Sequence, residues 1–127
     1  MLKSYKQTID RWLWPDVFRK QVESVAKAKQ AISSYRKAVG EPTGLAELMV
    51  FYCERAAGFA SDVGMDDENY LSALVRMFEQ ALTVANTLPA DSREALVARL
   101  DRVRNLSQNI GYGVGEDMDS IFARYMS

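Results

Sequence analysis

Residues 43–63 read TGLAELMVFYCERAAGFASDV and predict a helix that is apolar on nearly every side. Apolar side chains spaced by three and four residues form one stripe along this helix. The stripe contains Leu45, Leu48, Met49, Tyr52, Ala56, Phe59 and Val63. Further apolar side chains lie beside it, namely Val50, Phe51, Cys53 and Ala57. Such a helix belongs either in the middle of a helical bundle or under a contact between subunits.

The helical spacing continues on both sides of this segment, and no long stretch alternates apolar and polar residues with a period of two. Prolines, glycines and the glycine-rich segment 111–115 interrupt the pattern and mark the connections between helices. The predicted helices span residues 1–14, 16–39, 43–63, 67–88, 91–110 and 116–126. The sequence therefore predicts an all-α protein.

We expect these helices to form one domain, residues 1–127, as an up-down bundle of four long helices with a short helix at each end. Short connections between long helices favour antiparallel neighbours. The Trp/Leu-Gly/Tyr signature of tetratricopeptide-like repeats is absent from the sequence, which favours one bundle over a row of repeated helix pairs.

Acidic residues and glycines predict how several helices begin and end. Asp66, Asp67 and Glu68 are placed to accept hydrogen bonds from the first amides of the 67–88 helix. Asp91, followed three residues later by Glu94, resembles a capping box for the 91–110 helix. The glycines of segment 111–115 favour a turn with positive φ rather than a phosphate-binding loop.

Composition excludes several classes of chemistry. The chain has 127 residues, no histidine and a single cysteine, Cys53. Histidine-dependent nucleophilic catalysis, histidine-liganded zinc and proximal-histidine haem are excluded by this composition. We therefore expect no enzyme activity, no cofactor and no metal. The single cysteine, the lack of an apolar leader after Met1 and the lack of a long apolar run favour a cytoplasmic protein.

Charge is divided unevenly along the chain. Residues 1–39 contain nine basic and three acidic residues, whereas residues 40–127 contain seven basic and fourteen acidic ones. On the 16–39 helix, Arg19, Lys20, Lys27 and Lys37 point away from the apolar stripe. They form a candidate basic face for an anionic partner, or they lie beside the acidic remainder of the same bundle. The sequence pI of about 5.5 disfavours nucleic acid, and contact with a membrane surface is also disfavoured.

Three other cations project close to apolar stripes: Lys29, Arg36 and Arg99. Each is expected to extend its charge to water or to meet a carboxylate, with Glu54, Asp62 and Glu79 as candidate partners. Alternatively, such a cation lines an interhelical pocket for a small anionic ligand. The candidate pocket residues are Arg36, Tyr52, Phe59 and Phe78.

A homodimer is expected because the 43–63 helix has a second apolar side to cover. The candidate interface residues are Trp12, Trp14, Val50, Phe51 and Tyr112. Taken together, the sequence predicts a non-catalytic protein-interaction or assembly module. The alternatives are a sensor of a small anionic ligand and a module that binds a nucleic acid or a membrane surface through its basic helix.

Overall fold

The computed structural model describes residues 2–13 and 21–127, and within these ranges it is all-helical. Its α-helices are α1 (Leu2–Leu13), α2 (Gln21–Ala38), α3 (Pro42–Val63), α4 (Glu68–Ala85), α5 (Ala90–Leu106) and α6 (Val114–Met126). A short 3-10 turn, η1 (Ser107–Asn109), follows α5. The predicted all-α class is confirmed.

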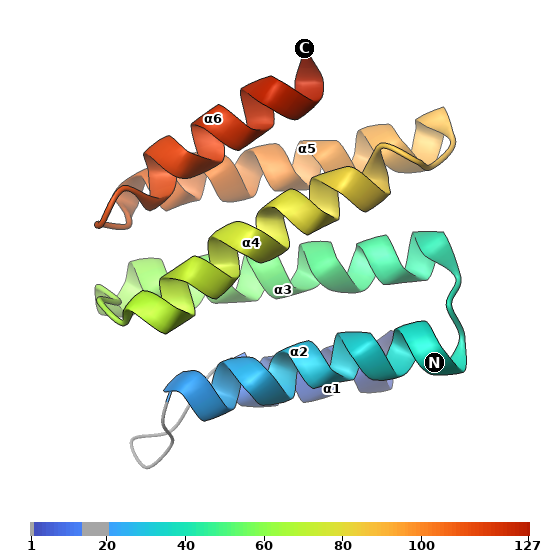
Figure 1. Cartoon of the computed structure of the whole chain (residues 1–127), viewed down its shortest axis with the longest axis horizontal. Coiled ribbons are helices and arrows are strands. Elements are labelled where there is room, and N and C mark those ends of the chain that lie inside the picture. Colours follow the sequence, from blue (N-terminus) through green and yellow to red (C-terminus); the bar gives the residue numbers. More distant parts are fainter. Residues whose placement is uncertain (1, 14–20) are drawn as a thin grey trace.

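The helices lie in two layers (Figure 1). Helices α1, α3 and α5 form the rear layer and run in one direction, whereas α2, α4 and α6 form the front layer and run in the opposite direction. Each rear helix pairs with the front helix that follows it in sequence, which gives three antiparallel hairpins stacked side by side. The middle hairpin, α3–α4, contacts both of the others.

This arrangement differs from a bundle of four helices with an accessory helix at each end. The expected lengths are found, because α2 to α5 have 17 to 22 residues whereas α1 and α6 have 12 and 13. However, α1 and α6 are full members of the two layers. Short connections make consecutive helices antiparallel, but they do not determine whether alternate helices surround one axis or lie side by side.

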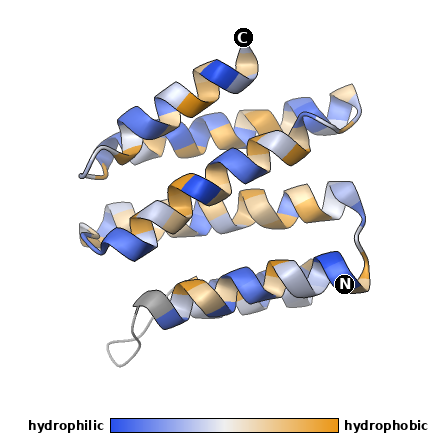
Figure 2. Cartoon of the chain, viewed as in Figure 1, coloured by the Kyte–Doolittle hydropathy of each residue, from blue (hydrophilic) through white to orange (hydrophobic). Residues whose placement is uncertain are grey.

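The central position of α3 explains why its sequence is apolar on nearly every side. Helices α1, α2, α4 and α5 all contact it. Val50, Cys53 and Ala57 are fully buried among them, and Figure 2 shows hydrophobic residues along most of the length of α3. The inference of a subunit contact from Val50 and Ala57 is therefore wrong, since their second apolar side is covered within this chain.

Carboxylates cap the starts of α3 and α4, and the sequence predicted the cap of α4 but not that of α3. Glu41 precedes α3, and its carboxylate accepts hydrogen bonds from the amides of Thr43 at 3.0 Å and Gly44 at 2.7 Å. Asp67 caps α4 by accepting from the amide of Tyr70 at 2.9 Å. Such bonds satisfy amides that have no partner within the helix.

Two other helix-end predictions need correction. The capping box of Asp91 and Glu94 does not form, because α5 begins at Ala90 and Asp91 already lies in its first turn. In the glycine-rich segment, Gly113 takes a positive φ of 75°, but so does Tyr112, at 61°. Gly115 lies inside α6, where a Cβ atom would be only 3.1 Å from Cα of Gln108. Close packing of α6 on η1 therefore favours a glycine there.

Candidate functional site

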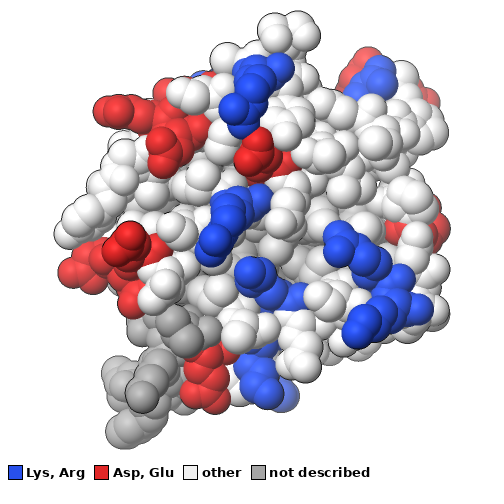
Figure 3. All heavy atoms as spheres, viewed as in Figure 1, with Lys and Arg blue, Asp and Glu red and all other residues white. Residues whose placement is uncertain are grey.

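Five exposed cations gather on the front layer. Lys27, Lys29, Arg36 and Lys37 come from α2, and Arg76 comes from α4. We call these five residues the basic face, and Figure 3 shows the basic side chains gathered over α2 and the middle of α4. Arg19 and Lys20, which the sequence also assigned to a basic face, lie outside the described residues. Sequence reasoning did not assign Arg76 to the basic face. The apolar stripe of α4 indicates that Arg76 is exposed, but the sequence does not show that α4 lies beside α2.

These five cations differ from most others in lacking a carboxylate partner. Among the residues that the structure describes, no acidic oxygen lies within 4.0 Å of the charged nitrogens of the basic face. The ion pairs lie elsewhere, as between Lys6 and Glu47 at 3.6 Å and between Arg55 and Asp10 at 2.6 Å. The acidic remainder of this chain therefore neutralises a cation of α1 but not those of α2.

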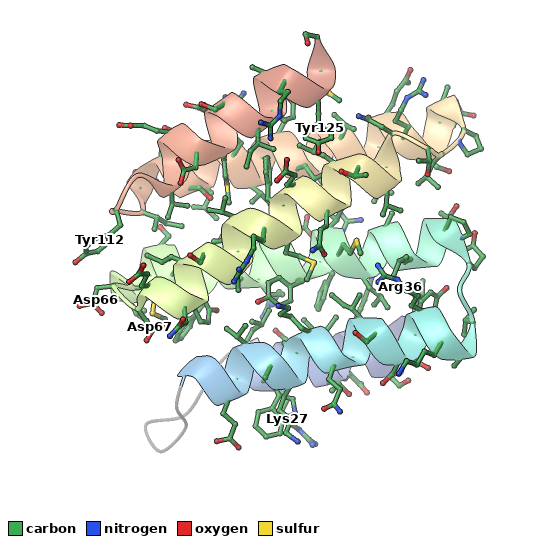
Figure 4. The ribbon with its side chains drawn as sticks, in the orientation of Figure 1. Lys27, Arg36, Asp66, Asp67, Tyr112 and Tyr125 are labelled. Atoms are coloured by element: carbon green, nitrogen blue, oxygen red, sulfur yellow. The ribbon has the colours of Figure 1, made fainter. Side chains whose placement is uncertain are left out.

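Lys27 has a further contact. Its Nζ lies 6.0 Å from the ring centroid of Trp12, which is half-buried on α1. Figure 4 shows the Lys27 side chain on the side of α2 that is away from α4. Lys27 thus belongs to the rim of the basic face.

Lys29 and Arg36 are exposed, so they follow the first of the two expected outcomes, in which the cation extends its charge to water. Among its described side chains, the buried stripe of α2 consists of Val25, Ala28, Ala31, Ile32 and Tyr35, apart from the buried Ser24. Long basic side chains at the edge of such a stripe reach water easily. Arg99, in contrast, meets the predicted partner Glu54 at 2.7 Å and also Glu47, which the sequence did not identify.

The predicted ligand pocket does not form. Tyr52 and Phe78 are fully buried in the core, and Phe59 is half-buried against the ring of Tyr70, with centroids 5.9 Å apart. Arg36, in contrast, is exposed on α2. The Tyr52 hydroxyl has no hydrogen-bond partner among the described residues, and burial raises the pKa of Tyr52, an effect that the nearby charge of Arg76 partly offsets.

A groove runs between α2 and α4 and has a volume of about 630 Å³. We call it the α2–α4 groove. Its polar lining consists of Lys27, Lys29, Gln30, Ser33, Asn69 and Arg76, with Val25, Ala26 and Ala73 as its apolar part. No carboxylate belongs to this described lining, so the groove presents positive charge and hydrogen-bond donors.

A second groove, of about 500 Å³, lies between α4 and the start of α6. Three acids line it, namely Asp66, Glu68 and Asp117, and Tyr112 stands beside them with 77% of its surface exposed. Figure 4 shows Tyr112, Asp66 and Asp67 at the same end of the molecule. Tyr112, one of the candidate interface residues, is thus exposed, and its proximity to the acids was not foreseen because two separate turns bring them together.

Of the other candidate interface residues, Trp14 lies outside the described residues and Phe51 is half-buried, with the Lys6 ammonium 5.3 Å from its ring centroid. Cys53 is fully buried, and this burial raises the pKa of its thiol. In the described part of the chain, no three His, Cys, Asp or Glu residues are grouped to hold a metal ion.

No helix within the described ranges combines the length and the apolar character needed to cross a membrane. No protein-family model, no curated protein and no solved structure matches the chain.

Proposed function

We propose that this chain is a non-catalytic protein-binding module that holds an acidic segment of a partner protein on its basic face. The observation that carries this proposal is the cluster of five exposed cations without carboxylate partners among the described residues. A cytoplasmic location and the absence of catalysis are part of the proposal, which does not require a homodimer.

The electrostatics of the face support an anionic partner. Like charges gathered on one surface repel each other over distances up to the Debye length, about 8 Å at physiological salt. An acidic partner relieves this repulsion and is drawn to the face during its diffusional approach. The polar side chains between the cations, including Gln30, Ser33 and Asn69, add hydrogen-bonding groups for the backbone of a bound segment.

A protein partner fits better than a nucleic acid. The sequence pI is about 5.5, whereas nucleic-acid-binding domains are usually strongly basic. Among the described residues, the face also offers no exposed aromatic ring on which a base could stack, because Trp12 is half-buried beneath Lys27. The acidic groove at the end of the same layer would repel a long polyanion.

The proposal can be tested by fluorescence anisotropy with a labelled glutamate-rich peptide of about twelve residues, long enough to follow α2. The variant Lys27→Glu/Arg36→Glu/Lys37→Glu reverses the charge of the face. Its control, Lys3→Glu/Arg93→Glu/Arg102→Glu, makes the same change on α1 and α5, where these cations also lack carboxylate partners among the described residues.

We expect the face variant to bind the peptide at least about tenfold more weakly than wild type, and the control to change binding by less than about threefold. Binding should also weaken between about 50 mM and 300 mM NaCl, because the contact is electrostatic. Equal losses in both triple variants would contradict the proposal. Tighter binding of a single-stranded DNA of equal charge would favour the polyanion alternative instead.

A further inference from the structure

The α2–α4 groove brings together two cations from different helices. Lys29 belongs to α2 and Arg76 to α4, and both line the groove. Neither has a carboxylate partner among the described residues. The groove between α4 and α6, which shares Arg76, has three acids in its lining. The positive character of the α2–α4 groove is therefore a local feature and does not extend over the whole front layer.

The chemistry of this lining consists mainly of hydrogen-bond donors. Arg76 offers a planar fork of five N–H groups and Lys29 three N–H groups. Asn69 and Gln30 add amide donors, and Ser33 adds a hydroxyl. Ala26 and Ala73 also line the groove, and their small side chains let a ligand approach both helices closely.

Arg76 also lies near a buried tyrosine. The Tyr52 hydroxyl is fully buried and has no hydrogen-bond partner among the described residues. The positive charge of Arg76 partly offsets the rise that burial causes in the pKa of Tyr52. Because Tyr52 does not line the α2–α4 groove, a ligand is indicated only by the groove lining and by the lack of a carboxylate partner for Arg76 among the described residues.

We propose that the α2–α4 groove binds the phosphoryl group of a phosphorylated partner segment, with Arg76 and Lys29 as its two anchors. A phosphate monoester has close to two negative charges near neutral pH and three terminal oxygens, so it matches two cations and several neutral donors. A carboxylate has one charge and two oxygens and uses only part of this set. The inference rests on the proposed function, since it specifies the chemistry of the partner on the same face.

The dimensions of the groove favour a chain-borne phosphate over a free ion. Its volume of about 630 Å³ far exceeds a single phosphate group. Arg36 and Lys37 continue the basic face along α2 and are available to acidic residues that flank the phosphorylated one. Recognition of phosphorylated segments by clustered arginine and lysine is a recurrent mode of peptide binding.

The test compares three labelled peptides of one sequence, with phosphoserine, glutamate or serine at the centre and glutamates on both sides. We expect wild type to bind the phosphoserine peptide at least about tenfold more tightly than the glutamate peptide. Arg76→Gln and Lys29→Gln should each reduce this preference to below about threefold, and Arg76→Lys should reduce it in part because the planar fork is lost. Arg102→Gln, an exposed change on α5, is the matched control and should keep the full preference.

Equal affinity of wild type for the phosphoserine and glutamate peptides would overturn this inference while leaving the proposed function intact. Failure of all three peptides to bind would contradict both this inference and the proposed function. Inorganic phosphate that competes at the same concentration as the phosphopeptide would assign the groove to a free anion and overturn the assignment to a partner segment. Circular dichroism of each variant verifies that it is folded, and all three substituted side chains are exposed.

Discussion

Gly44 and Gly58 both lie in α3, but only one of them is required by its neighbours. A Cβ atom on Gly44 would overlap the hydroxyl of Tyr35 and lie 2.6 Å from its Cζ, whereas a Cβ on Gly58 would meet no atom within 4 Å. Tyr35 is buried and packs edge-on against Tyr5, with centroids 5.3 Å apart, so its ring has little room to move.

We therefore expect Gly44→Ala to lower the free energy of unfolding by about 1–3 kcal/mol. The matched Gly58→Ala variant should raise it by about 0.5–1 kcal/mol, because alanine is the better helix former. Urea denaturation followed by circular dichroism measures both. If Gly44→Ala is as stable as wild type, the Tyr35 ring can move away from residue 44 without a cost in the free energy of unfolding.

Tyr112 adopts a backbone conformation that normally favours glycine. Its φ is 61° and its side chain is 77% exposed, so little packing compensates the strain. Tyr112→Gly should leave the free energy of unfolding unchanged or raise it by up to about 1 kcal/mol. The neighbouring Gly113→Ala, at φ 75°, should lower it by about 1 kcal/mol or more. A clear loss of stability in Tyr112→Gly, measured by thermal and urea unfolding, would show that the exposed ring has a structural role.

At the scale of the helices, one arginine joins α5 to α3. The Arg99 guanidinium donates to Glu54 from Nε at 3.0 Å and from Nη2 at 2.7 Å, and its Nη1 donates to Glu47 at 2.8 Å. Hydrogen bonds to both carboxylates raise the pKa of Arg99 above its usual value, so its charge persists across the accessible pH range.

Arg99→Met should lower the free energy of unfolding by about 1–3 kcal/mol, because the partly buried Glu54 loses its partner and Glu47 keeps only the longer contact with Lys6. Arg102→Met removes an exposed arginine from the same helix and should change it by no more than about 0.5 kcal/mol. Chemical denaturation distinguishes the two variants. If both variants change the free energy of unfolding by the same small amount, hydrogen bonds from water stabilise Glu47 and Glu54 as well as those from Arg99 do.

Sequence reasoning succeeded where the signal is local. Gly40 and Gly64 take the left-handed conformation after α2 and α3, where the sequence predicted connections between helices, and Asp67 caps α4 as expected. Apolar spacing located each α-helix in the described ranges, since period and stop signals lie within each segment. Glu54 was correctly chosen as a candidate partner of Arg99, although nothing in the sequence distinguished it from Asp62 or Glu79.

Predictions failed where the outcome depends on how helices are arranged. Val50 was assigned to an interface and Tyr52 to a pocket, because a helix that is apolar on nearly every side fits a core and a surface contact equally well. Only the two layers show that four helices surround α3. For the same reason the sequence did not predict that Arg76 and Lys29 line one groove, since no local pattern indicates which helix lies beside α2.

At the scale of the whole molecule, buried tyrosines predict a loss of stability in alkali. Tyr35, Tyr52 and Tyr70 are buried, and burial raises the pKa of each above that of an unfolded chain, about 10. Above that pH the unfolded state releases these protons while the folded state retains them. The free energy of unfolding should therefore be unaffected by these groups below about pH 9 and should decrease as the pH rises beyond 10.

Urea titrations between pH 8 and pH 11, with tyrosinate absorbance as a second signal, measure this decrease. Tyr52→Phe should match or exceed the stability of wild type near pH 7, because its hydroxyl has no partner among the described residues. Its advantage should grow in alkali, where wild type has one more proton to retain. An advantage that does not change with pH would contradict the assignment of alkaline sensitivity to Tyr52.

The stack of hairpins predicts that the molecule opens from its ends. Helices α3 and α4 are flanked by a hairpin on each side, whereas α1–α2 and α5–α6 each have one such neighbour. When stability comes from contacts between neighbouring units, an end unit can detach while the rest stays folded. Native-state hydrogen exchange should therefore show the slowest amides in α3 and α4, with α6 exchanging through an opening that costs less free energy than global unfolding. If the amides of every helix exchange with the same opening free energy, the molecule unfolds as one cooperative bundle. The hairpins would then not be separate units of stability.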